Sequence, residues 1–256
     1  MLAAERLQKI IQLVNERGSI RVAELSQLCG VTEETIRRDL DKLEDEGKLV
    51  RSHGGAISIQ DQANEIPFFV REATNTEEKR RIAQEAIKRI EPGDRIILDA
   101  STTAWWMARL LPDIPLTVLT NSVKVVLELS TKEKIQTIST GGLLQPSSLS
   151  YVGPLTERSL ESYHVDKMFL SCKGVHLDQA ITESNELQAI VKRKMIARAD
   201  TVYLLADYSK FGLRSFTRVA PWEDIDYLIT DEATDPELLN QISERWSISV
   251  TRLGSG

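Results

Sequence analysis

The chain has 256 residues, enough for one large hydrophobic core or for a small domain followed by a medium-sized one. Hydrophobic residues make up 41% and charged residues 27% of the sequence, as in ordinary soluble globular proteins, and apolar runs such as 201–206 are too short to span a bilayer. The net charge of −6, with nine Lys and Arg against ten Asp and Glu in residues 1–57, excludes any argument for nucleic-acid binding from bulk charge.

The cysteines and the start of the chain indicate the compartment. Cys29 and Cys172 fit neither a disulfide framework nor the spacing of a metal site. Glu5 and Arg6 interrupt the first apolar stretch, so no signal peptide is predicted. We therefore expect a cytoplasmic protein with reduced thiols that needs no metal or cofactor and does not enter a membrane.

The first two predicted elements are amphipathic helices. Apolar residues recur at i, i+3, i+4 and i+7 from Leu7 to Val14, which is the spacing of one helical face, and Gly18 ends this helix. The apolar residues of 22–28 predict a shorter second helix that ends at Gly30.

A tight turn leads into a third predicted helix, for which Thr32 is placed as the N-cap. Ile36, Leu40 and Leu43 lie on one side of this helix. The side turned away from the core carries Glu34, Arg37, Arg38, Asp41 and Lys42. Two helices joined by a turn, the second with an arginine-bearing polar face, are typical of a helix-turn-helix.

An extended basic segment follows the third helix. Lys48, Arg51 and His53 alternate along residues 47–55, which end in two glycines, as a hairpin wing requires. Arginine on such elements can bind phosphates or the edge of guanine. The candidate DNA-contacting residues are Thr32, Glu34, Thr35, Arg37, Arg38, Lys42, Arg51 and His53.

An ordinary alternative exists for the paired arginines. Arg37 and Arg38 can form ion pairs with Asp41, Glu33 or Glu34 on a solvated helix and serve no ligand. The occurrence of three helices, a turn and a basic extended segment within residues 1–57 favours DNA binding over that alternative.

Residues 58–74 have no sustained periodicity and predict a linker between a DNA-binding domain over 1–57 and a second domain over 75–253. In the second domain, strand-like runs at 95–99, 116–120, 135–139, 168–172, 201–206, 227–230 and 247–251 alternate with helical patterns at 103–111, 123–131, 186–199 and 236–245. This alternation predicts an α/β domain whose sheet is mostly parallel and has helices on both faces.

The loops that follow these strands are rich in small polar groups. Asp99–Thr103 leads directly into a helix, so that amides and hydroxyls converge at a helix N-terminus, which suits a phosphate. Each such loop alone is most often only a cap or a turn, but five at one edge of a sheet favour a binding site. The candidate ligand-binding residues are Asp99, Ser101, Thr102, Thr103, Asn121, Ser122, Gly141, Gly142, Lys173, Gly174, Asp207 and Lys210.

Both parts of the chain resemble the DeoR family of bacterial transcription regulators. The run Val31–Leu40, with His53–Ala56, resembles that family's winged helix-turn-helix signature, and the motifs at 99–103, 120–122, 141–142 and 207–212 resemble its sensor domain. The resemblance implies an α+β winged helix-turn-helix followed by a Rossmann-like α/β sensor domain related to ribose-5-phosphate isomerase. It also implies double-stranded operator DNA and a phosphorylated sugar as ligands and a homo-oligomer, a dimer or tetramer, as the working form.

The resemblance further implies which sugar and which roles to expect. Residues Leu98–Ile114 are most similar to regulators of L-rhamnose and L-fucose catabolism, which implies a 6-deoxyketose 1-phosphate such as L-rhamnulose 1-phosphate as effector. The phosphate is expected at Ser101–Thr103, and Asp207 with Lys210 is expected to recognise the effector. The stretch Ser171–His176 departs from the family pattern, which puts the roles of Lys173 and His176 in doubt.

Two other functions stay open from the residues. A sugar-phosphate isomerase with an accessory N-terminal domain would need a base such as Asp99 or Asp207 and an electrophile such as Lys173 or Lys210. The acid-dense catalytic stretch of the related isomerases is absent, which favours a regulator, with repression as the expected mode. A sugar-phosphate-binding protein whose N-terminal module contacts another protein is the third possibility.

Overall fold

The computed structural model describes residues 3–17, 19–46, 48–52, 55–58, 66–178 and 180–254. The chain divides into two compact units, Met1–Thr74 and Asn75–Gly256. His53 and residues 59–65 of the expected linker lie outside the described residues.

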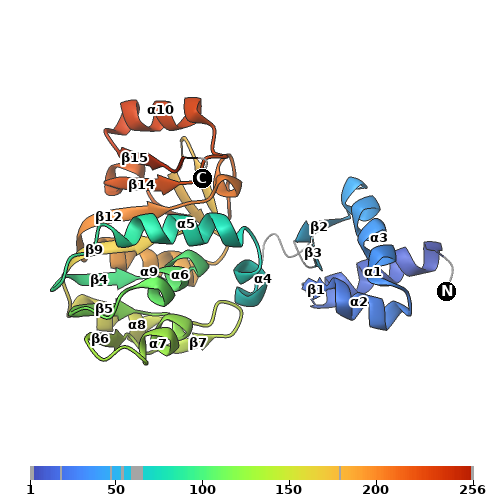
Figure 1. Ribbon diagram of the computed structural model, residues 1–256, viewed down its shortest axis with the longest axis horizontal. Helices are drawn as coiled ribbons and strands as arrows, with labels where there is room; N and C mark the ends of the chain where they lie inside the picture. Colours follow the sequence, from blue (N-terminus) through green and yellow to red (C-terminus); the bar gives the residue numbers. More distant parts are fainter. Residues whose placement is uncertain are drawn as a thin grey trace. The chain divides into compact units, whose positions relative to one another are not determined.

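The first unit is a small bundle of helices with a three-stranded sheet (Figure 1). Its elements are α1 (Ala3–Arg17), β1 (Ser19–Arg21), α2 (Val22–Cys29), α3 (Glu33–Asp45), β2 (Leu49–Ser52), β3 (Gly55–Ser58) and α4 (Phe68–Glu72). Strand β3 pairs antiparallel with both β1 and β2, so β2 and β3 form the expected hairpin wing. The short strand β1 was not predicted, because three residues are too few to show a period.

The core of the first unit comes from the predicted apolar faces. Ile10 and Val14 of α1 are fully buried with Leu25 of α2 and with Ile36 and Leu40 of α3. Gly30 ends α2 in the left-handed conformation at φ 66°, which glycine adopts without a Cβ clash. The predicted helix-turn-helix is therefore confirmed, with its three helices where the apolar periodicity placed them.

The second unit is built on a seven-stranded sheet in which each adjacent pair is parallel. Its strands are β4 (Arg95–Leu98), β5 (Leu116–Thr120), β6 (Ile135–Ser139), β9 (Val165–Leu170), β12 (Ala199–Leu205), β14 (Tyr227–Thr230) and β15 (Ser249–Arg252). Its helices are α5 (Thr76–Ile87), α6 (Thr102–Leu110), α7 (Val123–Leu129), α8 (Pro154–Glu161), α9 (Glu186–Ile196) and α10 (Pro236–Trp246). The predicted parallel α/β sheet is confirmed.

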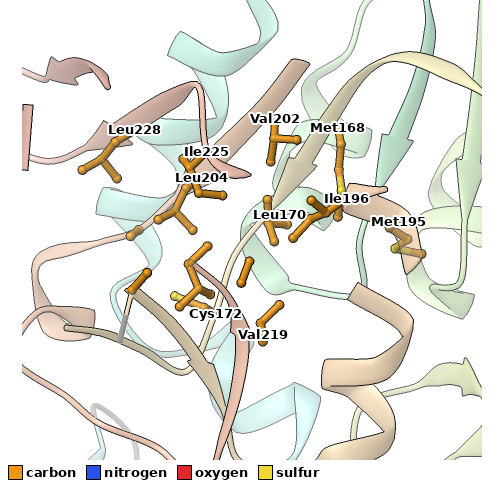
Figure 2. Packing of buried hydrophobic residues seen from close by; sticks show 14 of the residues in the cluster. Met168, Leu170, Cys172, Met195, Ile196, Val202, Leu204, Val219, Ile225 and Leu228 are labelled. Carbon is orange, nitrogen blue, oxygen red and sulfur yellow. The ribbon is translucent and has the colours of Figure 1, made fainter. Parts of the chain in front are cut away.

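Helices cover both faces of this sheet because successive strand residues point to opposite sides. Met168 and Leu170 of β9 pack with Met195 and Ile196 of α9 in the cluster of Figure 2. Phe169, between them, stacks on Tyr203 of β12 on the other face, with ring centroids 4.7 Å apart. Both faces of each central strand are therefore buried, as in other parallel sheets.

The order of the strands is β15-β14-β12-β9-β4-β5-β6. Because β4 is the first of these strands in the chain and lies next to β9, the order reverses between these two strands. Such a reversal is the topological switch point of a doubly wound sheet, where the loops after the two central strands diverge and leave a crevice for a ligand.

Small antiparallel additions complete the second unit. The hairpin β7 (Leu143–Gln145) and β8 (Ser150–Val152) follows β6, and β10 (Gly174–His176), β11 (Ala180–Glu183) and β13 (Thr217–Ala220) form a three-stranded sheet. These pieces, and helices α5 and α8, were not placed by the sequence pattern. The strand predicted over 168–172 begins three residues earlier, because Val165–Lys167 extend the pairing with β12.

Candidate functional site

The exposed face of α3 carries the predicted polar residues. Thr32 caps the helix by accepting a hydrogen bond from the amide of Thr35 at 3.3 Å, as predicted. Glu34, Arg37, Arg38, Asp41 and Lys42 are all exposed, while the apolar side of the helix is buried. The helix therefore presents its charges outward on a surface where a ligand can reach them.

The two arginines of α3 also form the ion pairs of the ordinary alternative. Arg37 lies 2.7 Å from Glu33, and Arg38 lies 3.4 Å from Glu34. The Arg38 side chain is 79% exposed, and exposed pairs of this kind contribute little to stability. Such exposed pairs can exchange their carboxylate for another anion.

Neighbouring elements hold α3 in place. Arg6 of α1 forms an ion pair with Asp39 at 2.5 Å, with both side chains 13% exposed. Arg51 of the wing binds Asp41, and its amide donates to Glu44 at 2.8 Å. Arg51, predicted to contact DNA, therefore ties the wing to α3, and Asp39 of the signature run joins α3 to α1.

In the second unit, four strands end in the same kind of turn at the carboxyl edge of the sheet. A side chain at the strand end accepts a hydrogen bond from the amide two residues later, which shapes the loop without any ligand. The acceptors are Asp99, Thr120, Asp207 and Asp231, and the donors are the amides of Ser101, Ser122, Ser209 and Ala233, at 3.0, 3.0, 3.1 and 2.9 Å. The predicted site residues lie on these loops or on the loops after β6 and β9.

The loops after β4 and β5 lead directly into helix caps. Ser101 accepts from the amide of Ala104 at 3.1 Å, and Ser122 accepts from the amide of Val125 at 3.2 Å. Both hydroxyls therefore perform the ordinary capping role. The first-turn amides of α6, at Thr102 and Thr103, point along the helix axis at the buried carboxyl edge of β4, where an anion is favoured.

Asp99 connects the two loops of the switch point. Its Oδ2 accepts the amide of Ser171, 72 positions along the chain, at 3.1 Å. The ammonium of Lys192 lies 3.2 Å from the same carboxylate oxygen and 2.5 Å from Glu183. Lys192 also donates to the carbonyl of Ser171 at 2.5 Å. Asp99 is fully buried, so it acts on the loops and not as an exposed ligand.

Lys192 is charged although it is buried. Burial lowers the pKa of this ammonium, but Glu183 and Asp99 outweigh that effect and raise the pKa above its usual value. The three side chains form one buried ionic cluster between α9 and the switch-point loops. Cys172, next to Ser171, is buried, and burial raises its pKa to about 12, which excludes a reactive thiolate at neutral pH.

The loop after β6 contains two adjacent glycines, Gly141 and Gly142, and packing explains the second of them. A Cβ on Gly142 would lie 2.1 Å from the hydroxyl of Thr156 and 2.9 Å from the carbonyl of Val152, and φ is +124°. A Cβ on Gly141 would meet nothing within 4 Å. Gly142 is therefore required by the close approach of Thr156 on α8, whereas the space beside Gly141 is open.

A buried polar group lies beside the loop after β5. The side-chain amide of Asn121 donates to the carbonyl of Tyr151 at 3.0 Å. Gln188 of α9 donates to Ser148 at 2.8 Å and to Ser150 at 2.6 Å. The predicted residue Asn121 thus anchors the β7–β8 hairpin at the carboxyl edge, and Gln188 connects that hairpin to α9.

The loop after β12 carries Asp207 and Lys210, the two residues expected to recognise an effector. Asp207 is 2% exposed and accepts from the side-chain amide of Asn75 at 2.9 Å. Burial raises the pKa of Asp207, but Lys210, Ser209, Lys79 and Asn75 together hold it below its usual value. Lys210 is half-buried and so is Lys173 after β9, whereas Lys192 is buried.

Sequence reasoning missed Lys79 and Lys192, and the sequence did contain a signal for both. Lys79 is buried at the i position of an apolar stripe that continues with Ile82, Ala83 and Ala86. Lys192 is buried four residues after Gln188, on the same side of α9. A lysine at a core position of an amphipathic helix requires a buried partner, and this requirement can be inferred from the sequence alone.

A cavity of about 470 Å³ lies elsewhere in the second unit, near the starts of β12 and β14. Its lining includes Arg193, Glu223, Asp224 and Asp226, and no predicted site residue. The excess of carboxylates there disfavours a phosphate. In the described part of the chain, no group of three or more His, Cys, Asp or Glu side chains could hold a metal ion. Among the same residues, none of the helices combines the length and the apolar composition that a membrane span requires.

Comparison with known proteins gives matches over both units. Residues 6–62 match the model of a DeoR-like helix-turn-helix domain, and residues 74–232 match that of the DeoR C-terminal sensor domain. The chain is 58% identical over 251 residues to the HTH-type transcriptional regulator YulB of Bacillus subtilis strain 168, covering 98% of this chain and 97% of that protein. It is 40% identical to the L-fucose operon activator of Haemophilus influenzae over 95% of this chain and 97% of that one.

Among solved structures, a ribose 5-phosphate isomerase A from Methanocaldococcus jannaschii matches with a TM-score of 0.41 and 18% identity. The match covers 54% of this chain and 55% of that chain.

Proposed function

The chain belongs to the DeoR family of transcriptional regulators, and from this premise we propose that its first unit reads operator DNA under the control of a phosphorylated sugar bound by its second unit. In this proposal α3 enters the major groove with Arg37, Arg38 and Lys42, while Thr32, Glu34 and Thr35 lie at its N-terminal end. The wing supports α3 through Arg51, and His53 belongs to the same segment.

The observation that carries the sensing half is the position of the Asp99–Thr103 loop. This loop follows β4 at the switch point, where ligands bind in doubly wound sheets, and it ends at the N-terminus of a helix. The phosphate is proposed to bind there, against the first-turn amides at Thr102 and Thr103 and the hydroxyl of Ser101.

The remaining candidates take different roles by their burial. Lys173 and Lys210 supply positive charge toward the ligand because they are only half-buried. Asp99 and Asp207 are fully engaged with loop amides and with Lys192 or Asn75, so they shape the site. Asn121, Ser122, Gly141, Gly142 and Gly174 complete the edge of the site.

The proposed effector is a 6-deoxyketose 1-phosphate such as L-rhamnulose 1-phosphate. Support comes from the similarity of Leu98–Ile114 to regulators of deoxysugar catabolism and from relatives named as L-fucose operon activators in Haemophilus influenzae and Escherichia coli. The proposed mode is repression by an oligomer, a dimer or tetramer, that the sugar phosphate releases from DNA.

A DNA-shift titration on the region upstream of the protein's own operon tests the proposal. L-Rhamnulose 1-phosphate, L-fuculose 1-phosphate and D-fructose 1-phosphate are compared, and one deoxyketose phosphate should shift the DNA affinity at least about tenfold. Tighter binding on addition of the sugar would contradict the proposed release from DNA. Absence of any shifted complex with this DNA would contradict the DNA-reading half.

Catalysis is tested separately. The purified protein is incubated with the same sugar phosphates and the mixture is followed by NMR. We expect no aldose–ketose interconversion, because both buried aspartates are held by backbone amides and cations at the site. Turnover would support the isomerase alternative.

A further inference from the structure

Asn75 is the first residue of the second unit, and its side chain contacts the loop that follows β12. Its amide donates to Asp207 at 2.9 Å and to the hydroxyl of Ser209 at 3.0 Å. These partners lie 132 and 134 positions further along the chain. Asn75 is only 8% exposed, so this contact is shielded from water.

The backbone of Asn75 starts helix α5. Its carbonyl accepts the amide of Lys79 at 3.1 Å. Its φ of 47° and ψ of 46° lie in the left-handed region, which is unfavourable for a residue with a Cβ unless the surroundings hold it there. The loop after β12, residues 206–216, carries Lys210 and is called the effector loop below. Asn75 therefore joins the effector loop, through its side chain, to the first turn of α5, the helix at which the chain enters the sensor unit.

The loop on the other side of this contact carries Lys210. Asp207 accepts from the amide of Ser209 at 3.1 Å as well as from the Ser209 hydroxyl, and its carbonyl accepts the amide of Lys210 at 3.0 Å. Three donors thus converge on one oxygen of a buried carboxylate. Hydrogen bonds to a charged acceptor are stronger than neutral ones, so a displacement of Lys210 would be passed to Asp207 and to Asn75.

We propose that Asn75 couples the effector loop to the linker. A ligand that binds the ammonium group of Lys210 then changes the backbone conformation of Asn75, where the chain leaves the sensor unit. The signal then follows the covalent chain from Asn75 toward α4 and the DNA-reading unit. This inference rests on the proposed function for its biological meaning, but the coupling between the loop and the start of α5 is a property of the ligand-free protein.

Hydrogen exchange on the full chain without any ligand tests the coupling directly. Ser209→Ala removes one partner of Asn75 far from α5 in sequence, and Asn75→Gly removes the amide while tolerating the positive φ. Both variants should raise exchange about tenfold at residues 79–82, whose amides are the first in α5 to donate hydrogen bonds within the helix. Asp235→Ala, which removes the N-cap of α10, is the matched control and should leave these residues unchanged. Unchanged exchange in Ser209→Ala would overturn the coupling.

A second measurement tests whether Asn75 transmits the effect of the sugar phosphate to the affinity for DNA. Calorimetry with L-rhamnulose 1-phosphate gives the affinity of Asn75→Gly for the sugar, and at a sugar concentration that saturates the variant the shift in DNA affinity should be at least about fivefold smaller than in the wild-type protein. A shift of wild-type size in that variant would overturn the coupling. If the wild-type protein binds neither this sugar phosphate nor operator DNA, the proposed function fails, and the exchange experiment still decides the coupling.

Discussion

At the scale of single residues, the buried carboxylates of the sensor unit act mainly on its own backbone. Asp99, Asp207 and Asp231 each accept the amide two residues later, and Asp231 also accepts the amide of Tyr208 at 2.8 Å. A carboxylate with two amide donors is satisfied without water or ligand. Asp99 and Asp207, which the sequence analysis places among the candidate ligand-binding residues, thus determine the shape of the loops.

Lys192 gives a sharp prediction at this scale. Lys192→Met leaves Asp99 and Glu183 buried without their cation, so the free energy of unfolding should fall by about 3–5 kcal/mol. Urea denaturation measures this change. Lys194→Met on the same helix is the control, because its pair with Glu161 is exposed and should contribute little to stability. Equal losses in both variants would contradict the buried cluster.

The two adjacent glycines after β6 give a second prediction. Gly142→Ala forces a Cβ against Thr156 and the backbone of Val152, so we expect a loss of about 3 kcal/mol or more, or failure to fold. Gly141→Ala meets open space and carries only the strain of its positive φ, about 1 kcal/mol. Thermal unfolding of both variants measures the two losses. A larger loss of stability in Gly141→Ala than in Gly142→Ala would contradict the prediction.

At the scale of elements, α3 is held from both sides by charged contacts. Arg6 fixes it to α1 through Asp39, and Arg51 fixes it to the wing through Asp41. Thr32 caps its N-terminus. The arginines that remain on its exposed face are paired only within the helix, so they are the side chains that can change partner.

Arg38 is the position where this distinction can be measured. Arg38→Ala should weaken operator binding by about 1–3 kcal/mol, which is roughly tenfold to a hundredfold, and leave the melting temperature nearly unchanged. Fluorescence anisotropy with labelled DNA measures the affinity. Arg80→Ala on α5, another surface arginine in an ion pair, is the matched control. Equal losses of operator affinity in both variants would show that Arg38 of α3 does not contact the DNA.

At the scale of the whole molecule, two units with separate hydrophobic cores share one chain. The net charge of −6 opposes association with DNA over long distances. α3 itself holds three Lys and Arg against six Asp and Glu, so the proposed DNA binding depends on where the single cations Arg37, Arg38 and Lys42 lie and not on the net charge of the helix. A dimer or tetramer would multiply these contacts without changing the sign of the net charge.

The salt dependence of operator binding tests whether the protein binds DNA through phosphate contacts. If about six phosphates are neutralised per complex, raising sodium chloride from 50 to 200 mM should weaken operator binding on the order of a thousandfold. Binding that is independent of salt would instead fit an N-terminal unit that contacts protein. Light scattering in the same buffers gives the oligomeric state, and a monomer at the concentration of tight binding would contradict the proposed oligomer.

The local part of the fold was accessible from the sequence. The apolar spacing placed α1, α2 and α3, and the strand runs from 95 to 251 reappear as the seven parallel strands within a few residues. The three-residue strands β1, β7, β8 and β10 were not predicted, because they are too short to establish a period. Thr32 and Ser101 were identified as polar residues at helix starts, and both are caps.

The sequence by itself determined the helix-turn-helix, the parallel sheet and the edge on which the polar loops gather, because periodicity and capping depend on neighbours within one or two turns. Only the tertiary structure decided that β4 lies beside β9 and creates the switch point. It also decided that Asp99 binds the amide of Ser171 and that Asn75 binds Asp207, 132 positions away. Strand order and buried ion pairs depend on which distant segments meet, and no local pattern contains that information.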